Sequence, residues 1–133
     1  MASGYPDYEG GKRKVYLVPA WAAEEGLDKN VVGTSALTAS GFMATTAQYT
    51  VPAGKTLYIT DAGLGVTGGV VAEVQWYIYF DETIKTINGG VQGSIVAFTK
   101  PLVATAGTVV SVRGKHVSAD NQFLMGYLGG YEV

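Results

Sequence analysis

The sequence predicts an all-β protein folded as one antiparallel β-sandwich or barrel. Three observations favour this class: apolar and polar residues alternate in several short runs, the runs recur at intervals of roughly 8–14 residues, and glycine-rich turns separate them. The chain has 133 residues, with 19 glycines and no cysteine. A domain of this length buries about two thirds of the surface of its unfolded chain, so it can form a core without disulfides.

The first part of the chain differs from the rest. Glycine, proline and charged residues at a free end rarely bury enough apolar surface to fold alone. We therefore expect an extended N-terminal arm over residues 1–40, with one strand at Lys14–Val18. In residues 19–30, PAWAAEEGLDKN, alanine and glutamate favour a helical turn or two before Gly26.

The compact β domain covers residues 41–133 and begins with two strands joined by a turn. Two β-rich runs flank Pro52–Lys55, where proline presets its own φ and glycine supplies a left-handed position, so the chain is expected to turn there. Leu57 and Ile59 then lie on one face of the outgoing strand. A similar turn is predicted at Thr105–Thr108, TAGT.

The run from Val70 to Phe80 has the clearest period of two and predicts a strand with one buried side. Its apolar face carries Val74, Trp76, Ile78 and Phe80, and its polar face carries Glu73, Gln75, Tyr77 and Tyr79.

Two turns and a final strand follow. Asp81–Thr83 has the composition of a turn, and Asn88–Gly90 contains the Asn-Gly pair that is typical of hairpins. In residues 122–133 apolar side chains occupy both faces, which indicates a central or covered strand.

The low charge of the chain points to assembly. Charged residues make up 15% of the sequence and hydrophobic residues 47%, whereas ordinary soluble chains carry about a quarter charged residues. Such a balance indicates that neighbouring subunits cover part of the surface. We expect a homo-oligomer.

The order of these segments resembles a known class of protein. A glycine-bearing arm is followed by TVPAGKTLYITDAGL at residues 50–64, by PLVATAGTVVSVRG at 101–114 and by a closing GYLGGYEV at 126–133. Over roughly residues 42–133 this is similar to the small single jelly rolls in virions of tailed phages, particularly trimeric capsid-decoration (cement) proteins.

The resemblance implies a jelly-roll sandwich that forms a trimer on a capsid lattice. The arm would bridge capsomers and thereby stabilise the shell, so the partners would be the major capsid protein or other shell subunits, and the protein would be located in the virion. The matching segments are turns and strand patterns, so no functional residue is carried over.

No pattern for catalysis or cofactor binding is present in the sequence. His116 is the only histidine, and beside a strand end it is expected to be a solvated or hydrogen-bonded surface residue rather than a general base. No serine lies in a GxSxG elbow, and the glycine pairs lack the spacing of a phosphate loop. We predict that the protein is not an enzyme.

Other ligand classes are not favoured either. Carboxylates such as Asp81 and Glu82 have no cation-loop spacing and are expected to be solvated, with a calcium site as the open alternative. The net charge of −2 argues against a protein built to bind nucleic acid. The chain has neither the apolar run of a signal peptide nor one of about 20 residues that would span a membrane.

Two groups of residues are candidates for contact with a partner. The arm offers aromatic side chains that could serve as anchors. Its short run of positive charges is either solvated, which is the usual case, or docks on an acidic surface of a partner. These arm residues are Tyr5, Tyr8, Lys12, Arg13, Lys14, Tyr16 and Trp21. On the polar face of the best-defined strand, Gln75, Tyr77 and Tyr79 are expected to contact a neighbouring subunit, or alternatively to stack on sugar rings.

Three hypotheses of function follow. The first is a structural virion protein that decorates or cements a capsid, with the arm adding a strand to a free sheet edge. The second is a receptor- or glycan-binding head of a phage tail or cell surface. The third, a cupin-like enzyme, is the weakest because it needs a cluster of histidine and carboxylate ligands.

Overall fold

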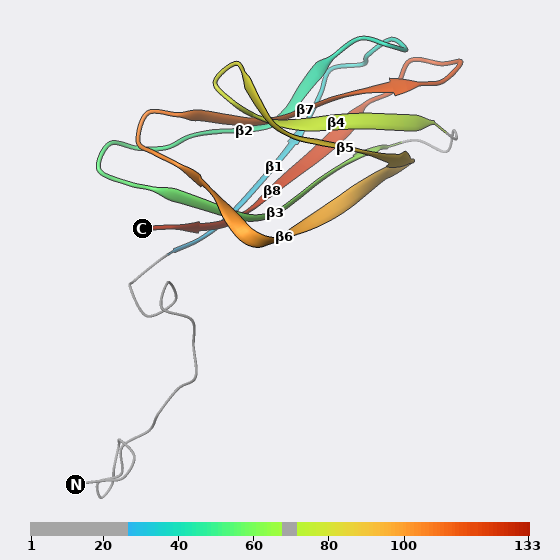
Figure 1. Ribbon diagram of the computed structural model, residues 1–133. Coiled ribbons are helices and arrows are strands. Elements are labelled where there is room, and N and C mark those ends of the chain that lie inside the picture. The colour runs from blue at the N-terminus through green and yellow to red at the C-terminus, as the bar shows by residue number, and fades with distance from the viewer. Residues whose placement is uncertain (1–26, 68–71) are drawn as a thin grey trace, which may run out of the picture.

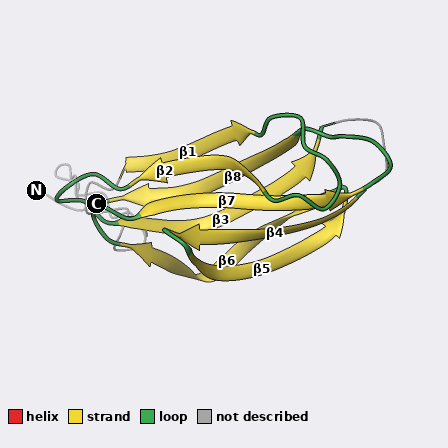
Figure 2. Ribbon diagram, turned by 90° about the horizontal axis from the view of Figure 1, so that it is seen from above, coloured by secondary structure: helices red, strands yellow, loops and turns green. Residues whose placement is uncertain are grey.

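The computed structural model describes residues 27–67 and 72–133, which fold into two antiparallel sheets packed face to face (Figures 1 and 2). In chain order the strands are β1 (Leu27–Thr34), β2 (Ala44–Thr50), β3 (Leu57–Val66), β4 (Glu73–Phe80), β5 (Thr83–Val91), β6 (Gly93–Ala104), β7 (Val109–Val117) and β8 (Leu124–Glu132). These residues contain no helix. The predicted all-β class is confirmed.

The strand order identifies the topology. One sheet has the order β1-β8-β3-β6 and the other β2-β7-β4-β5. Each strand of the first half pairs with one of the second half: β1 with β8, β2 with β7, β3 with β6 and β4 with β5. The chain is therefore one long hairpin, reversed at the β4–β5 turn and wrapped around a core. This is the connectivity of an eight-stranded jelly roll, so the predicted fold is confirmed.

The core lies between the inward faces of the two sheets. In β4 the residues Val74, Trp76 and Ile78 are buried, while Glu73 and Gln75 on the other face are exposed, as the alternation predicted. The indole Nε1 of Trp76 donates to the Ser94 hydroxyl at 2.8 Å, so its polar atom is satisfied inside the core. The other buried core residues are aliphatic: Ala47, Val51, Leu57, Ile59, Ala62, Leu64, Ala104, Val110, Val112, Leu124 and Leu128.

Three of the predicted turns are present. Gly54 and Gly107 have φ angles of 77° and 87°, which a residue with a Cβ rarely adopts. Each turn is closed by a backbone bond: Lys55 N donates to Pro52 O at 3.1 Å, and Thr108 N to Thr105 O at 3.1 Å. Asp81, with φ 53°, reverses the chain between β4 and β5. The last run is also as predicted, since β8 is a central strand between β1 and β3.

The hairpin turn expected at Asn88–Gly90 is wrong. These residues lie inside β5, and the chain reverses at Gln92 and Gly93, which both have positive φ. A Cβ on Gly90 would lie 2.8 Å from the Gly93 carbonyl oxygen, so this glycine is required by the close return of the chain. The Asn-Gly pair resembles a hairpin signal, but its backbone is held in the ladder by β4.

The boundary between arm and domain lies earlier than residue 41. β1 begins at Leu27 and pairs with β8 over its whole length, so residues 27–40 belong to the sandwich. Residues 27–30, at the end of the expected helical piece, are strand. Pairing with β8 holds these residues as strand, and they come after Gly26, before which the helical turns are expected. The rest of that piece, the strand at Lys14–Val18 and the arm itself lie outside the described residues and stay predictions.

One buried polar pair links the two sheets. Glu132 of β8 points inward and is buried, and the Tyr49 hydroxyl of β2 donates to its carboxylate. Burial of Tyr49, reinforced by this hydrogen bond and the neighbouring negative charge, raises the pKa of the phenol to about 12. The buried Glu132 carboxylate therefore accepts a hydrogen bond from a neutral hydroxyl and is not left without a partner inside the sandwich.

Gly130 marks the tightest approach of β3 to β8. A Cβ at this position would overlap the carbonyl oxygen of Tyr58, which belongs to the neighbouring strand backbone. The register between these strands shifts between Ile59 and Asp61, so β3 bends toward β8 here. Only a residue without a side chain fits.

We expect Gly130→Ala to destabilise the fold by at least about 2 kcal/mol, because the clash is with backbone that cannot rotate away. The free energy of unfolding in urea measures this. Gly65→Ala is the matched control, since its Cβ would lie 3.0 Å from the nearest atom, the Gln92 carbonyl oxygen. Equal losses in both variants would contradict the close approach at Gly130.

Candidate functional site

The predicted contact residues Gln75, Tyr77 and Tyr79 lie together on the outer face of the β2-β7-β4-β5 sheet. Successive residues of a strand point to opposite faces, so the burial of Trp76 and Ile78 places these three outside. The Tyr77 hydroxyl donates to Gln75 Oε1 at 3.4 Å. The two tyrosine rings meet edge to face, with centroids 6.2 Å apart. The structure thus forms one polar aromatic ridge from them.

Arg113 of β7 fixes one end of this ridge. Its guanidinium stacks over the Tyr79 ring at 4.2 Å, and its Nε donates to the Ser111 hydroxyl at 2.9 Å. Two further nitrogens donate to the Glu82 carboxylate at 3.2 and 3.1 Å. The donated hydrogen bonds and the positive charge of Arg113 lower the pKa of Glu82. The arginine therefore ties β7 to the β4–β5 turn and holds Tyr79 in place.

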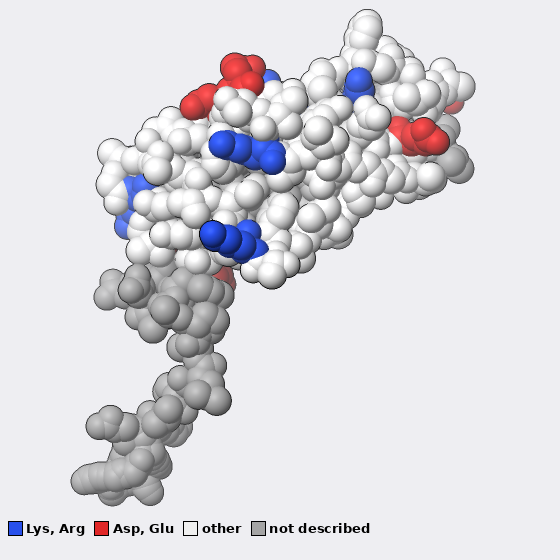
Figure 3. Space-filling model, viewed as in Figure 1, with Lys and Arg blue, Asp and Glu red and all other residues white. Residues whose placement is uncertain are grey.

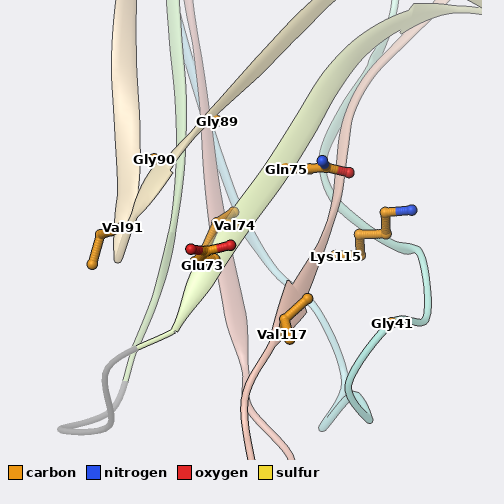
Figure 4. A pocket seen from close by; sticks show the side chains of 9 residues that line it. All are labelled: Gly41, Glu73, Val74, Gln75, Gly89, Gly90, Val91, Lys115 and Val117. Carbon is orange, nitrogen blue, oxygen red and sulfur yellow. The ribbon is translucent and has the colours of Figure 1, made fainter.

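A hollow of about 450 Å³ lies beside Gln75 on the same face (Figure 4). It exists because Gly89 and Gly90 of β5 have no side chains next to β4. Figure 4 shows the Gln75 amide and the Lys115 ammonium on one side of the view and the Glu73 carboxylate on the other. The hollow is lined by Gly41, Glu73, Val74, Gln75, Gly89, Gly90, Val91, Lys115 and Val117. It offers hydrogen-bond donors and acceptors to a ligand beside apolar walls.

The outer face of the other sheet carries a larger and more apolar hollow, of about 810 Å³. Its floor is the backbone of Gly63 and Gly65 in β3, and its walls include Val32, Ile95 and Met125. Farther along this sheet the Tyr127 hydroxyl donates to Asn30 Oδ1 at 3.3 Å. A hydrogen bond to Asp61, together with burial and the Asp61 charge, raises the pKa of Tyr127.

Large apolar side chains are exposed on both faces. The most exposed of them are Ile95 (78%), Ile87 (76%) and Phe42 (68%). Two of these, with Val91, lie on β5 and β6, the strands on either side of the connection at Gln92 that crosses from one sheet to the other. In the view of Figure 3, the lower right part of the surface, over β6, carries neither blue nor red atoms. This surface has the composition of one covered by a partner.

His116 is not a surface residue as expected, because it has no exposed surface. Its Nε2 donates to the Thr38 carbonyl oxygen at 2.8 Å, since a carbonyl can only accept, and its Nδ1 lies 2.9 Å from the Ser118 hydroxyl. The ring holds the β1–β2 connection against β7, so the expected hydrogen bonding is present in a buried setting. Among the described residues no group of three or more His, Asp or Glu side chains could hold a metal ion.

The arm candidates cannot be placed. Tyr5, Tyr8, Lys12, Arg13, Lys14, Tyr16 and Trp21 lie outside the described residues. Sequence reasoning missed Lys115 as a neighbour of Gln75, because the two residues come together only through the pairing of β4 with β7. The alternation in β4 gave a signal for Glu73. For the apolar surface on β5 and β6, the signal in the sequence was the evenly spaced Ile87, Val91 and Ile95, all of which are exposed.

Comparison with known proteins identifies no family for this chain. Neither a protein-family model nor a curated protein matches the sequence. Among solved structures, the fold is similar to a chain in the structure of infectious bursal disease virus Gt strain, at 10% identity and a TM-score of 0.30. The match covers 82% of this chain and 33% of that chain, so this protein spans about a third of its length. The jelly-roll assignment rests on the strand order described above.

A search for helices of sufficient length and hydropathy to cross a membrane found none in residues 27–67 and 72–133.

We expect Arg113→Met to raise the pKa of Glu82 toward 4.5, its ordinary value, because the hydrogen bonds and the positive charge that lower it are removed. Carboxyl NMR of the labelled protein during an acid titration measures this. Lys115→Met is the matched control, since it removes a cation from the same strand without touching Glu82. An unchanged Glu82 pKa in Arg113→Met would show that the ion pair does not form in solution.

Proposed function

We propose that this protein is a non-enzymatic structural protein of a virus particle, of the capsid-decoration type, and that it acts as a homotrimer. The observation that carries the proposal is the exposure of large apolar side chains on both outer faces of the jelly roll. Burial of apolar surface is worth about 25 cal/mol per Å², so such faces are stabilised by contact with neighbours. The low charge of the chain and its resemblance to jelly-roll decoration proteins support the same conclusion.

The proposed mechanism is cross-linking. The sandwich acts as a rigid block whose faces pack against shell subunits, and the arm reaches from one subunit to the next. Aromatic residues of the arm, such as Tyr16 and Trp21, would supply anchors, and the basic run at Lys12–Lys14 would contact an acidic surface. The partners would be further copies of this chain and the major capsid protein.

Two measurements test the proposal. Mass spectrometry of purified virus particles from the source should find the chain in a fixed ratio to the major capsid protein. Light scattering of the purified protein should give three times the chain mass of 13.9 kDa. Absence from the particles would remove the virion role, and a monomer at all concentrations would remove the trimer.

We expect deletion of Met1–Val18 to leave the sandwich folded, because all eight described strands start at Leu27 or later. The far-ultraviolet circular dichroism should stay that of a β protein. The deletion should nevertheless weaken binding to neighbouring protomers by at least about tenfold, as measured by sedimentation, because the anchors of the arm are lost.

A second variant changes Lys12, Arg13 and Lys14 to alanine. Because it keeps the aromatic anchors, any loss of binding that it shows in the same sedimentation measurement comes from the charges and not from the apolar contacts. If the truncated chain assembles as tightly as the full one, or does not fold, the arm is not a tether.

A second candidate function is glycan binding at the surface of a virus or cell. The aromatic ridge and the neighbouring hollow, which is lined by Glu73, Gln75 and Lys115, favour this function. A sugar ring is bound by stacking on an aromatic ring together with hydrogen bonds to nearby donors and acceptors.

Under this second function, Tyr77→Ala should abolish saccharide binding on a glycan array, because the stacking surface is lost. Tyr77→Phe should keep most of it, since the ring remains. If the native protein binds no saccharide on the array, the ridge is a protein contact.

A further inference from the structure

Four strands lie at the edges of the two sheets, and three of them are interrupted. β2 shifts register against β7 between Thr45 and Gln48, and β5 shifts against β4 between Ile84 and Thr86. β6 loses its register with β3 between Ala97 and Leu102, where the chain carries Lys100 and Pro101. Bulges, lysine and proline are the devices that keep an edge from pairing with another chain.

β1 is the exception among the edges. It pairs with β8 over eight consecutive residues, Leu27 to Thr34, without a bulge. It contains no proline, and its single lysine, Lys29, lies over the Tyr49 ring at 5.6 Å. Within residues 27–67 and 72–133 this edge is therefore long and regular, and it lacks the protective devices of the other three.

The hydrogen-bonding groups of this edge can be assigned. Ser35 N donates to Leu124 O at 2.8 Å in the same register, so Ser35 stands in a hydrogen-bonded pair. Such pairs alternate along an antiparallel ladder. The backbone groups of Asp28, Asn30, Val32 and Thr34 consequently point away from β8. Within the described part of the chain, no backbone group bonds to them.

The side chains next to the edge are apolar on both faces. Val31 packs against the core and is only partly buried, whereas Val32 on the outer face is 63% exposed. A strand added beside β1 would cover both of them if it carried apolar residues on both of its own faces. A second β1 strand does not meet this condition, because its outer face carries Asp28, Asn30 and Thr34.

We propose that the free edge of β1 accepts the segment Lys14–Val18 of a second copy of this chain. The sequence KVYLV places Val15 and Leu17 on one face and Tyr16 and Val18 on the other, so it is apolar on both. Eight residues, 19–26, lie between this segment and Leu27, and they can span about 30 Å when extended, which reaches an edge of a directly adjacent subunit. The inference rests on the proposed function and identifies the surface on which the arm acts.

Proline substitution at the edge tests this pairing. Val32→Pro removes an N–H that points outward and that β8 does not use, so the fold should survive, as measured by circular dichroism and urea unfolding. The self-association constant should fall at least about tenfold, because the inserted strand loses a backbone bond and its regular path. Val32→Ala is the matched control: it removes the exposed side chain but keeps the N–H, and it should retain most of the association.

A mixing experiment separates exchange between copies from pairing within one chain. Full-length Tyr16→Pro has an intact edge and a defective donor, and Val32→Pro has the reverse. Each alone should self-associate at least about tenfold more weakly than the native protein, and their mixture should form a one-to-one complex by sedimentation. If the mixture stays monomeric, the segment does not pair with the edge of a second copy and the inference is wrong.

Two further outcomes would overturn the inference and leave the proposed function intact. If Val32→Pro associates as the native protein does while deletion of the arm abolishes association, the arm acts elsewhere. If Val32→Ala loses as much association as Val32→Pro, the contact is made by the outer sheet face. Loss of the virion location or of self-association in the native protein would instead count against the proposed function itself.

Discussion

The close approach of β2 to the β1–β8 pair is the constraint on which the rest of the fold depends. A Cβ at Gly33 would overlap the Thr46 carbonyl oxygen, and one at Gly126 would overlap the Thr46 side chain. The bulge in β2 around Thr46 brings this strand under the opposite sheet, and the Thr46 hydroxyl donates to Val112 O at 2.8 Å. Glycine at both positions lets the two layers meet on this side.

The two sides of the sandwich differ in how the apolar residues between the sheets are covered. On the side of β1 and β2 the sheets cover one another, and Tyr49 and Glu132 close the gap between them. On the opposite side, Val96 and Phe98 of β6 are only partly buried against the core. The exposed Ile87 and Ile95 lie on β5 and β6. Their side chains lie on the outer faces of the two sheets, Ile87 opposite Tyr77 and Ile95 opposite Gly63, where a neighbouring subunit can cover them.

The polar groups of the described chain mostly hold the structure in place. Arg113 uses its charge to fix the β4–β5 turn and the Tyr79 ring, and the buried His116 fastens the β1–β2 connection. No buried side-chain nitrogen or oxygen in residues 27–67 and 72–133 lacks a partner. The groups left for a ligand or a partner, Glu73, Gln75 and Lys115, lie on the surface around one hollow. This distribution agrees with a protein whose proposed role is contact with neighbours.

The sequence by itself determined the class of the fold, the faces of its strands and two of its tightest turns. The alternation in β4 separated Trp76 from Tyr77 and Tyr79 correctly, because the side chains of any strand alternate whatever it pairs with. Gly54 and Gly107 could be placed in turns because positive φ is a local requirement. Tertiary structure alone decided that Asn88–Gly90 is strand, that β1 starts at Leu27, that His116 is buried and that β1 keeps a regular free edge. Each of these depends on which strand lies alongside, and pairing between residues far apart leaves no local pattern in the chain.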